Sequence, residues 1–359
     1  MAENVGMNAF SQGLSRRAVL LSALTVPAAW AVPPRAMQFP RDFGSHPDLR
    51  TEWWYITGHA KSAAREFGFQ LTFFRSRVEA TQSMQSAFAA RQLIFAHAAI
   101  TDLEGRKLWH DQRIARAGFG VAFASETDTD VRLHDWTLRR DSNGYVARLP
   151  ADGFAIDLRF NPTQPVMLQG SAGLSRKGPH AEQASYYFSE PQLAAKGSLS
   201  LQGRHFDVQG TAWLDREWSD AYLDPDAAGW DWIGMNLFDG SALMAFRIRG
   251  RDGSAIWAGG SLRTADGHQR VFGPDELHFD AEGTWTSPRT RAVYPTRWRI
   301  RTPAGTFAVR ALLDDQELDS QGSTGTVYWE GLSDLLDASG KPVGRGYLEL
   351  TGYAQPLRL

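Results

Sequence analysis

The chain has 359 residues, of which 43% are apolar and 22% are charged, and its formal net charge is −2 at pH 7. This length favours two domains, and this composition excludes intrinsic disorder. Lys and Arg are scattered rather than gathered in a basic stripe, which argues against nucleic-acid binding. The chain has no cysteine, so disulfides, zinc–thiolate centres and cysteine nucleophiles are excluded.

Residues 1–31 are predicted to be an export signal. Arg16 and Arg17 precede an apolar run over residues 18–32, and residues 29–31 read Ala-Trp-Ala, a small-x-small cleavage pattern. The paired arginines indicate a twin-arginine signal, and the apolar run is too short for a comfortable membrane span. We therefore expect a periplasmic or secreted protein, with an uncleaved anchor as the alternative.

The remaining chain consists of short alternating runs bounded by turns, which are typical of antiparallel strands. The clearest runs cover residues 46–59, 68–77, 91–102, 154–160, 243–262 and 294–301. Helical periods are scarce, and only residues 190–196 and 333–337 are expected to form short helical turns. Each half has about eight to ten predicted strands, enough to close a barrel. We therefore predict an all-β protein of two antiparallel barrels in tandem, residues 32–222 and 223–359, packed against each other.

The segment of residues 211–234 contains four tryptophans, six acidic residues and one arginine. If its start is extended, Trp213, Asp215 and Glu217 share one face of the strand, opposite Arg216. A carboxyl group beside indole rings is partly desolvated, which raises its pKa and lets it act as an acid near neutral pH. We interpret this segment as the joint between the domains, carrying half of a binding or catalytic pocket. The alternative is that both carboxylates pair with arginines and hold the domains together.

Other carboxylates also stand beside aromatic residues. Glu52 precedes Trp53 and Trp54, and a strand that buries two adjacent tryptophans must be covered on both faces. Glu330 and Glu349 repeat this pattern of glutamate among aromatic residues. The recurrence is more than core packing alone requires. Glu52 is interpreted either as an acid–base residue or as the partner of an arginine.

His97 lies inside the apolar run of residues 91–102. It is interpreted either as a hydrogen-bonded core residue or as a general base in the N-terminal domain. Tyr186 and Tyr187 point to opposite faces of an extended segment, so at most one of them reaches a given pocket. No histidine lies within four residues of another, and phosphate- and dinucleotide-binding glycine motifs are absent, so we expect neither a metal nor a cofactor.

Several blocks of the sequence, in the same order, resemble those of the AttH-like family of secreted bacterial proteins. They include HPDLRTEWWYITGH at residues 46–59, FAHAAITD at 95–102, GTAWLDREW at 210–218 and GWDWIGMNL at 229–237. Relatives of this family include the carotenoid 1,2-hydratases (hydroxyneurosporene synthases) and, more distantly, fungal enzymes that guide pericyclic cyclisations. The resemblance implies two tandem lipocalin-like barrels, a pocket formed by both, and an association with envelope ABC transporters. Members have also been labelled predicted secreted hydrolases.

The chain departs from the carotenoid hydratases at the positions of their chemistry. In those enzymes the segment matching residues 215–218 reads Asp-His-Asn-Trp, whereas here Arg216 replaces the histidine. Their proton-donating aspartate corresponds to a position near residues 243–246, where this chain has no carboxylate. These differences argue against carotenoid hydration by the same residues.

The leading hypothesis is an exported, monomeric protein that binds a small hydrophobic molecule, such as a terpenoid or lipid, in an aromatic, carboxylate-lined pocket between the domains. As an enzyme it would catalyse cofactor-free, acid-assisted hydration, isomerisation or cyclisation, with Asp215 or Glu217 as proton donor and tryptophans stabilising a cation. The candidate catalytic residues are Asp215, Glu217, Glu52 and His97. The candidate ligand-binding residues are Trp53, Trp54, Tyr187, Trp213, Trp218, Trp230, Asp231, Trp232 and Glu330.

Two alternatives belong to other classes. One is a lipocalin-type carrier that hands a ligand to an envelope ABC transporter, and the other is a carbohydrate-binding protein. The enzyme hypothesis predicts a pocket carboxylate with no arginine within salt-bridge reach, whereas the carrier hypothesis predicts that every pocket carboxylate is paired. A sugar-binding protein would expose its aromatic rings in an open groove.

Overall fold

The computed structural model describes residues 32–63, 65–221 and 223–357. The predicted export signal lies outside the described residues. The regular structure of the described chain is β-strand apart from three single-turn 3-10 helices: η1 (Arg41–Phe43), η2 (Glu79–Thr81) and η3 (Pro274–Glu276). No helix in this part of the chain is long and apolar enough to cross a membrane.

The first sheet has thirteen antiparallel strands in the order β4-β3-β2-β1-β13-β12-β9-β8-β7-β6-β5, with β10 and β11 pairing β12 beside this path. Its strands are β1 (Thr51–Ser62), β2 (Arg65–Arg77), β3 (Gln92–Asp102), β4 (Lys107–Arg116), β5 (Ala122–Ala124), β6 (Asp130–Leu133), β7 (Trp136–Asp141), β8 (Gly144–Ala151), β9 (Phe154–Asn161), β10 (Met167–Leu168), β11 (Leu174–Arg176), β12 (Ala184–Leu201) and β13 (Arg204–Ala221). The sheet curls until β5 and β6 approach β3 and β4.

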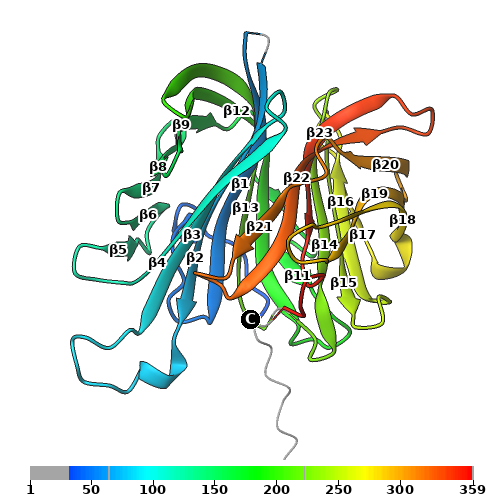
Figure 1. The fold of residues 1–359 in the computed structure, drawn as a ribbon. Helices are drawn as coiled ribbons and strands as arrows, with labels where there is room; N and C mark the ends of the chain where they lie inside the picture. The colour runs from blue at the N-terminus through cyan, green and yellow to red at the C-terminus, as the bar shows by residue number, and fades with distance from the viewer. Residues whose placement is uncertain (1–31, 64, 222, 358–359) are drawn as a thin grey trace, which may run out of the picture.

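The second sheet has ten strands in the order β17-β16-β15-β14-β23-β22-β20-β19-β18, with β21 pairing β22. Its strands are β14 (Ala227–Leu237), β15 (Ala242–Gly250), β16 (Ala255–Arg263), β17 (Gln269–Phe272), β18 (His278–Thr286), β19 (Val293–Thr302), β20 (Gly305–Ala311), β21 (Glu317–Ser320), β22 (Thr326–Leu336) and β23 (Pro342–Leu350). The protein is therefore all-β, with two lipocalin-like antiparallel barrels in tandem, and the two sheets lie side by side in Figure 1.

The two sheets repeat one topology. In each, the first strand pairs with the last, so β1 lies against β13 and β14 lies against β23. Each first strand also begins a meander, β1 to β4 in one sheet and β14 to β17 in the other. The duplication is visible in the strand order, although no repeat is visible in the sequence.

Alternation along the strands decides which side chains fill the barrels. On β9, Phe154, Ile156, Leu158 and Phe160 all point into the core of the first barrel, as expected for a strand with one buried face. On the central strands both faces are covered, because the two barrels pack against each other through the outer faces of β1 and β2 and of β22 and β23. Trp54 is fully buried and the consecutive Trp53 is half-buried for this reason.

The structure differs from the sequence-based predictions in two details. Residues 190–196 and 333–337 are not helical turns, because 190–196 belong to the long strand β12 and 333–336 to the long strand β22. A register shift between Glu190 and Leu193, with Gln192 at φ 58°, locally disturbs the strand and its alternation. The first sheet also has thirteen strands rather than eight to ten, because several short strands extend it at one edge.

Candidate functional site

A cavity of about 320 Å³ lies between the two barrels. It is lined by the outer faces of strands from both sheets, while the barrel interiors are filled by separate apolar cores. The strands that contribute are β1, β2, β3, β4, β12, β13, β14, β15, β22 and β23. The site therefore depends on the contact between the barrels rather than on either barrel interior.

Alternation along β1 and β14 supplies the aromatic wall of the cavity. On β1, the side chains of Trp53 and Tyr55 point out of the first barrel into the cavity, on the face opposite Trp54. On β14, the side chains of Trp230 and Trp232 likewise face the cavity. The Tyr55 and Trp232 rings meet edge to face at 5.4 Å. Aromatic faces in such a cavity attract and stabilise cationic carbon centres.

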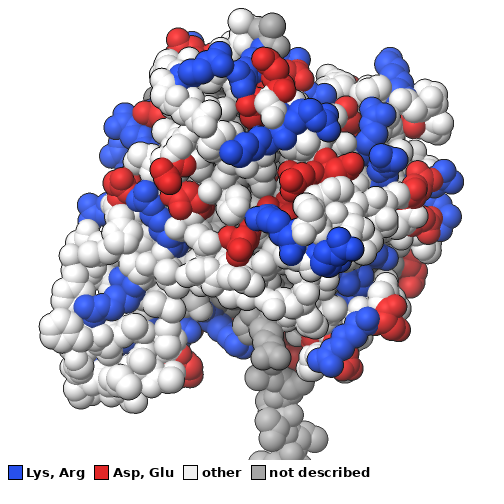
Figure 2. All heavy atoms as spheres, viewed as in Figure 1, with Lys and Arg blue, Asp and Glu red and all other residues white. Residues whose placement is uncertain are grey.

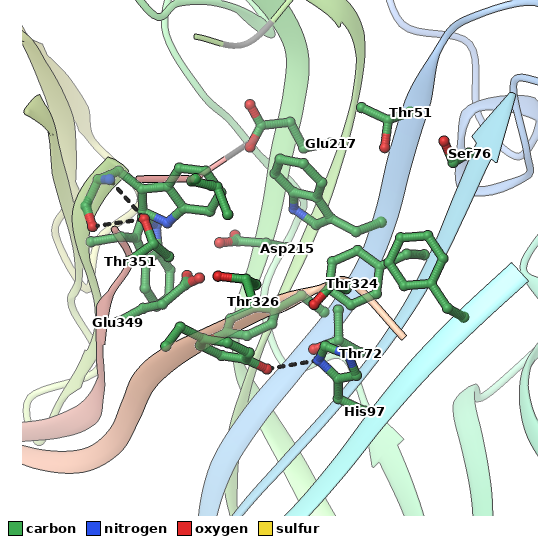
Figure 3. A pocket seen from close by; sticks show the side chains of 18 of the residues that line it. Thr51, Thr72, Ser76, His97, Asp215, Glu217, Thr324, Thr326, Glu349 and Thr351 are labelled. Atoms are coloured by element: carbon green, nitrogen blue, oxygen red, sulfur yellow. Dashed lines mark hydrogen bonds between the residues drawn. The ribbon is translucent and has the colours of Figure 1, made fainter. Parts of the chain in front are cut away.

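Asp215 projects from β13 into the centre of the cavity (Figure 3). Its side chain accepts hydrogen bonds from the Tyr187 hydroxyl at 2.7 Å, from Ser189 Oγ at 2.5 Å and from Trp213 Nε1 at 2.7 Å. Within the described chain, Asp215 forms no ion pair. Burial raises the pKa of Asp215, the three hydrogen bonds partly offset it, and the result is a pKa of about 7.

Glu330 and Glu349 are directly opposite each other on β22 and β23. Both line the cavity, and neither forms an ion pair with a described residue. Burial, together with the charge of Glu349, raises the pKa of Glu330 well above its ordinary value. Burial, together with the charges of Asp215 and Glu217, raises the pKa of Glu349 to about 8. The two glutamates thus hold protons at neutral pH.

Glu217 is the paired carboxylate of the cavity. Its Oε1 lies 2.8 Å from Lys177 Nζ and accepts a hydrogen bond from Ser185. The Lys177 ammonium also lies 4.6 Å from the centre of the Tyr187 ring and 4.3 Å from that of Phe246. Lys177 therefore neutralises Glu217 and leaves Asp215 as the β13 carboxyl group that lines the cavity without an ion pair in the described chain.

His97 lines the cavity from β3 and bridges the two barrels. Its Nδ1 lies 2.8 Å from the Tyr328 hydroxyl and its Nε2 lies 2.9 Å from Ser323 Oγ. Ser323 donates its own hydroxyl proton to Gln112 at 2.7 Å, so His97 Nε2 is the donor to Ser323 and Nδ1 accepts from Tyr328. Burial lowers the pKa of His97 to about 3, so the ring is a neutral hydrogen-bonded bridge at the cavity wall.

Glu52 lies outside the cavity, inside one end of the first barrel. Arg75 and Arg216 both form ion pairs with it, and Ser45 and the backbone of His46 donate hydrogen bonds to it. Burial raises the pKa of Glu52, but Arg216, His46 and Arg75 outweigh this effect and hold it well below its ordinary value. Of the two interpretations of Glu52, the structure supports pairing with arginine.

The second barrel contains an equivalent ion cluster around Asp231. Arg247 Nε lies 2.6 Å and Arg249 Nε 3.7 Å from Asp231 Oδ2, and the Tyr353 hydroxyl donates to Oδ1 at 2.8 Å. Asp231 therefore does not line the cavity, contrary to its placement among the ligand-binding candidates. The physical reason is strand alternation, since Trp230 and Trp232 on either side of it take the cavity face.

Three predicted ligand-binding tryptophans also lie outside the cavity. Trp54 and Trp218 point into the first barrel, where Arg216 stacks on Trp54 at 3.8 Å and His46 on Trp218 at 4.1 Å. Trp213 lies behind Asp215 and reaches the site only through its hydrogen bond to that carboxyl group. The remaining candidates do line the cavity: Asp215, Glu217, His97, Trp53, Tyr187, Trp230, Trp232 and Glu330.

The barrel duplication places matching pairs on the two sides of the cavity. Trp53 on β1 is in register with Glu217 on β13, and Trp232 on β14 is in register with Glu349 on β23. The ion clusters follow the same rule, since Glu52 is in register with Arg75 and Asp231 with Arg247. Two equivalent tryptophan–glutamate pairs thus face one shared space.

The sequence-based list of site residues omitted Glu349, Tyr55 and Lys177. Glu349 and Tyr55 carried a signal, because each stands next to or among aromatic residues on a strand with both faces covered. Lys177 lies between β11 and β12 and carried no such signal. Among the described residues, no group of three or more His, Asp or Glu side chains is arranged to hold a metal ion.

Replacing Glu349 with Gln is expected to stabilise the protein at alkaline pH. The pKa of Glu349 is raised from 4.5 to about 8 in the folded state, so wild-type stability falls as the pH rises through this range. The variant should lack that part of the pH dependence. Its free energy of unfolding should exceed that of the wild type by about 3 to 5 kcal/mol above pH 8 and should be almost the same below pH 4.5.

Denaturant unfolding at a series of pH values measures this effect. The matched control is Glu104→Gln, at a glutamate whose side chain is 70% exposed, and its stability profile should follow the wild type. Equal stability of Glu349→Gln and wild type at alkaline pH would contradict a raised pKa for Glu349 in the folded protein.

Comparisons with known proteins agree with this architecture. Residues 30–353 match the AttH-like family. A crystal structure of a protein assigned as AttH from Nitrosomonas europaea is 52% identical, with a TM-score of 0.84, over 90% of this chain and 99% of that chain. No curated protein matches the chain.

Two solved structures with lower sequence identity have the same fold. Kievitone hydratase from Nectria haematococca is 16% identical, with a TM-score of 0.70, over 89% of this chain and 94% of that chain. CghA in complex with Sch210972 is 13% identical, with a TM-score of 0.56, over 90% of this chain and 96% of that chain.

Proposed function

Because the chain belongs to the AttH-like family, we propose that it binds a small, uncharged hydrophobic molecule between its two barrels and catalyses cofactor-free, acid-assisted hydration or isomerisation of that molecule. We propose further that it acts outside the cytoplasm, after export directed by residues 1–31. The first proposal builds on a family with hydratase-like structural neighbours, and the second on the paired arginines and the apolar run that follows them.

The observation that carries the proposal is the state of Asp215. This carboxyl group is 3% exposed, lines the cavity and has no ion pair within the described chain. A carboxyl group with a pKa of about 7 exchanges protons readily at neutral pH, as general acid–base catalysis requires. The enzyme hypothesis requires such a carboxylate, whereas the carrier hypothesis requires all of them to be paired.

The walls of the cavity support the same reaction class. Protonation of an alkene produces a carbocation, which the faces of Trp230, Trp232 and Tyr187 would stabilise. The aromatic side chains enclose the site rather than forming an open platform, since Trp232 is only 6% exposed. This enclosure favours a hydrophobic ligand over a sugar.

Native mass spectrometry of the protein purified from its own periplasmic fraction tests the function, and recovery from that fraction tests the export. A bound apolar molecule should be released by solvent extraction. Incubation of that molecule, and of kievitone, the compound named in a hydratase of this fold, should give a product with the mass of one added water or an isomer of equal mass.

Release of the bound molecule unchanged, with no conversion of it after prolonged incubation, would instead support the carrier hypothesis.

Figure 2 shows Lys and Arg interspersed with Asp and Glu on the visible face. The electrostatic potential over that face therefore has no uniform sign, which is compatible with a neutral ligand.

A further inference from the structure

We propose that the carboxyl pair Glu330 and Glu349 delivers the proton to the substrate and that Asp215 accepts the proton of the water that adds. This inference rests on the function proposed above. It divides the acid and base steps between the two barrels, because the pair belongs to the second sheet and Asp215 to the first.

The geometry of the pair is that of a proton donor. Glu330 and Glu349 are adjacent across β22 and β23, and like charges directly opposite each other in a sheet repel. No cation among the described residues forms an ion pair with either of them, so the pair retains protons. Oε1 of Glu330 and the hydroxyl of Tyr55 are buried, and the weak contact between these two side chains leaves both without a well-formed hydrogen bond in the described chain, so both are available to a bound molecule.

The surroundings of Asp215 are those of a proton acceptor. Three donors, on Tyr187, Ser189 and Trp213, converge on its two oxygens. Tyr187 is itself held by Trp232 Nε1 at 3.1 Å, which directs its hydroxyl proton to Asp215. Hydrogen bonds to a carboxylate favour the ionised form. Each glutamate of the pair has a single such donor, Tyr55 for Glu330 and Trp230 for Glu349, against three for Asp215.

The charged and titratable groups around the pair come from four strands. They are Tyr55 on β1, Asp215 and Glu217 on β13, Tyr328 on β22 and Tyr347 on β23. Lys177, which also lines the cavity, is paired with Glu217. The pair therefore faces neutral hydroxyls and negative charge, which keeps its protons in place until a substrate takes one.

The hydration step balances with the groups present. The π electrons of the substrate double bond form a C–H bond with the proton of the pair, which leaves one carboxylate on the pair and a carbocation beside the aromatic wall. The oxygen of a water molecule bonds to the cationic carbon, and its surplus proton passes to Asp215. The proton then returns from Asp215 to the pair; Asp215 and Glu349 both point into the centre of the cavity in Figure 3.

Infrared titration of the purified protein tests this assignment without a substrate, because protonated and ionised carboxyl groups absorb separately. We expect a carboxylic acid band that declines in two steps, one around pH 7 as Asp215 ionises and one around pH 8 as Glu349 ionises. The step around pH 8 should be lost in the double variant Glu330→Gln/Glu349→Gln and retained in Glu104→Gln, a matched change at an exposed glutamate. Glutamine has the size of glutamate, and thermal unfolding confirms that each variant is folded.

A step around pH 8 that persists in the double variant, or the absence of that step from the wild type, would overturn the assignment while leaving the proposed function untouched. Once a substrate is in hand, turnover in D2O separates the two roles. Glu349→Gln should lower deuterium entry into the substrate carbon skeleton by about 10²- to 10⁴-fold. Asp215→Asn should allow deuterium entry but lower water addition by a similar factor. The opposite pattern would reverse the roles of the two groups.

Discussion

Replacing Asp215 with Asn is expected to lower hydration of the substrate by about 10²- to 10⁴-fold, the usual loss when a general acid–base residue is removed. Asn has almost the same shape but neither donates nor accepts a proton at neutral pH. Turnover is measured by the appearance of the hydrated product. Binding of N-phenyl-1-naphthylamine, a neutral apolar probe, should stay close to wild type, because the aromatic walls are unchanged.

Glu217→Gln is the matched control for this variant. Glu217 lies two residues along the same strand and faces the same cavity, but Lys177 neutralises it. We expect it to lose much less turnover than Asp215→Asn. Full turnover by Asp215→Asn would remove Asp215 from the reaction.

The wild-type pH profile of turnover should be bell-shaped. The rate should increase as Asp215 ionises around pH 7 and decrease as Glu349 loses its proton around pH 8. The two limbs lie close together, so the optimum should be narrow. Asp215→Asn should remove the acidic limb from the activity that remains.

The second large effect is expected from Glu52→Gln, which should destabilise the protein by about 3 to 5 kcal/mol. The change leaves Arg75 and Arg216 buried, 1% exposed each, without their shared negative partner. The pKa of Glu52 is held well below 4.5, so its stabilising contribution is complete above that pH and is lost as the pH falls toward the folded-state pKa. The stability difference between variant and wild type should therefore narrow in acid.

Denaturant unfolding at neutral and acidic pH measures this effect, again with the exposed Glu104→Gln as control. At a temperature where the variant is folded, its turnover should be retained, because Glu52 lies outside the cavity. Loss of turnover in a fully folded Glu52→Gln protein would contradict the structural role assigned here.

Much of this architecture could be predicted from the sequence because strand alternation is a local property. The placement of Asp215 and Glu217 on one face, with Arg216 opposite, follows directly from the two-residue period of an extended chain. The same period, read across residues 230–232, would also have placed Asp231 on the face opposite its neighbouring tryptophans. The prediction of two helical turns was wrong, because the local sequence pattern does not show which segments pair with neighbouring strands in a sheet.

The sequence by itself determined the all-β class, the two tandem barrels and a joint rich in indole rings and carboxyl groups. Only the tertiary structure decided which carboxyl groups are paired, because the partners are distant in sequence. Glu52 pairs with Arg216, which lies 164 positions away in the sequence. Glu52 and Glu330 both stand beside aromatic residues in the sequence, so this local pattern does not distinguish the paired glutamate from the unpaired one. Whether a buried carboxylate is neutralised by an arginine or kept protonated by another glutamate depends on strand register, and register is settled only when the sheets form.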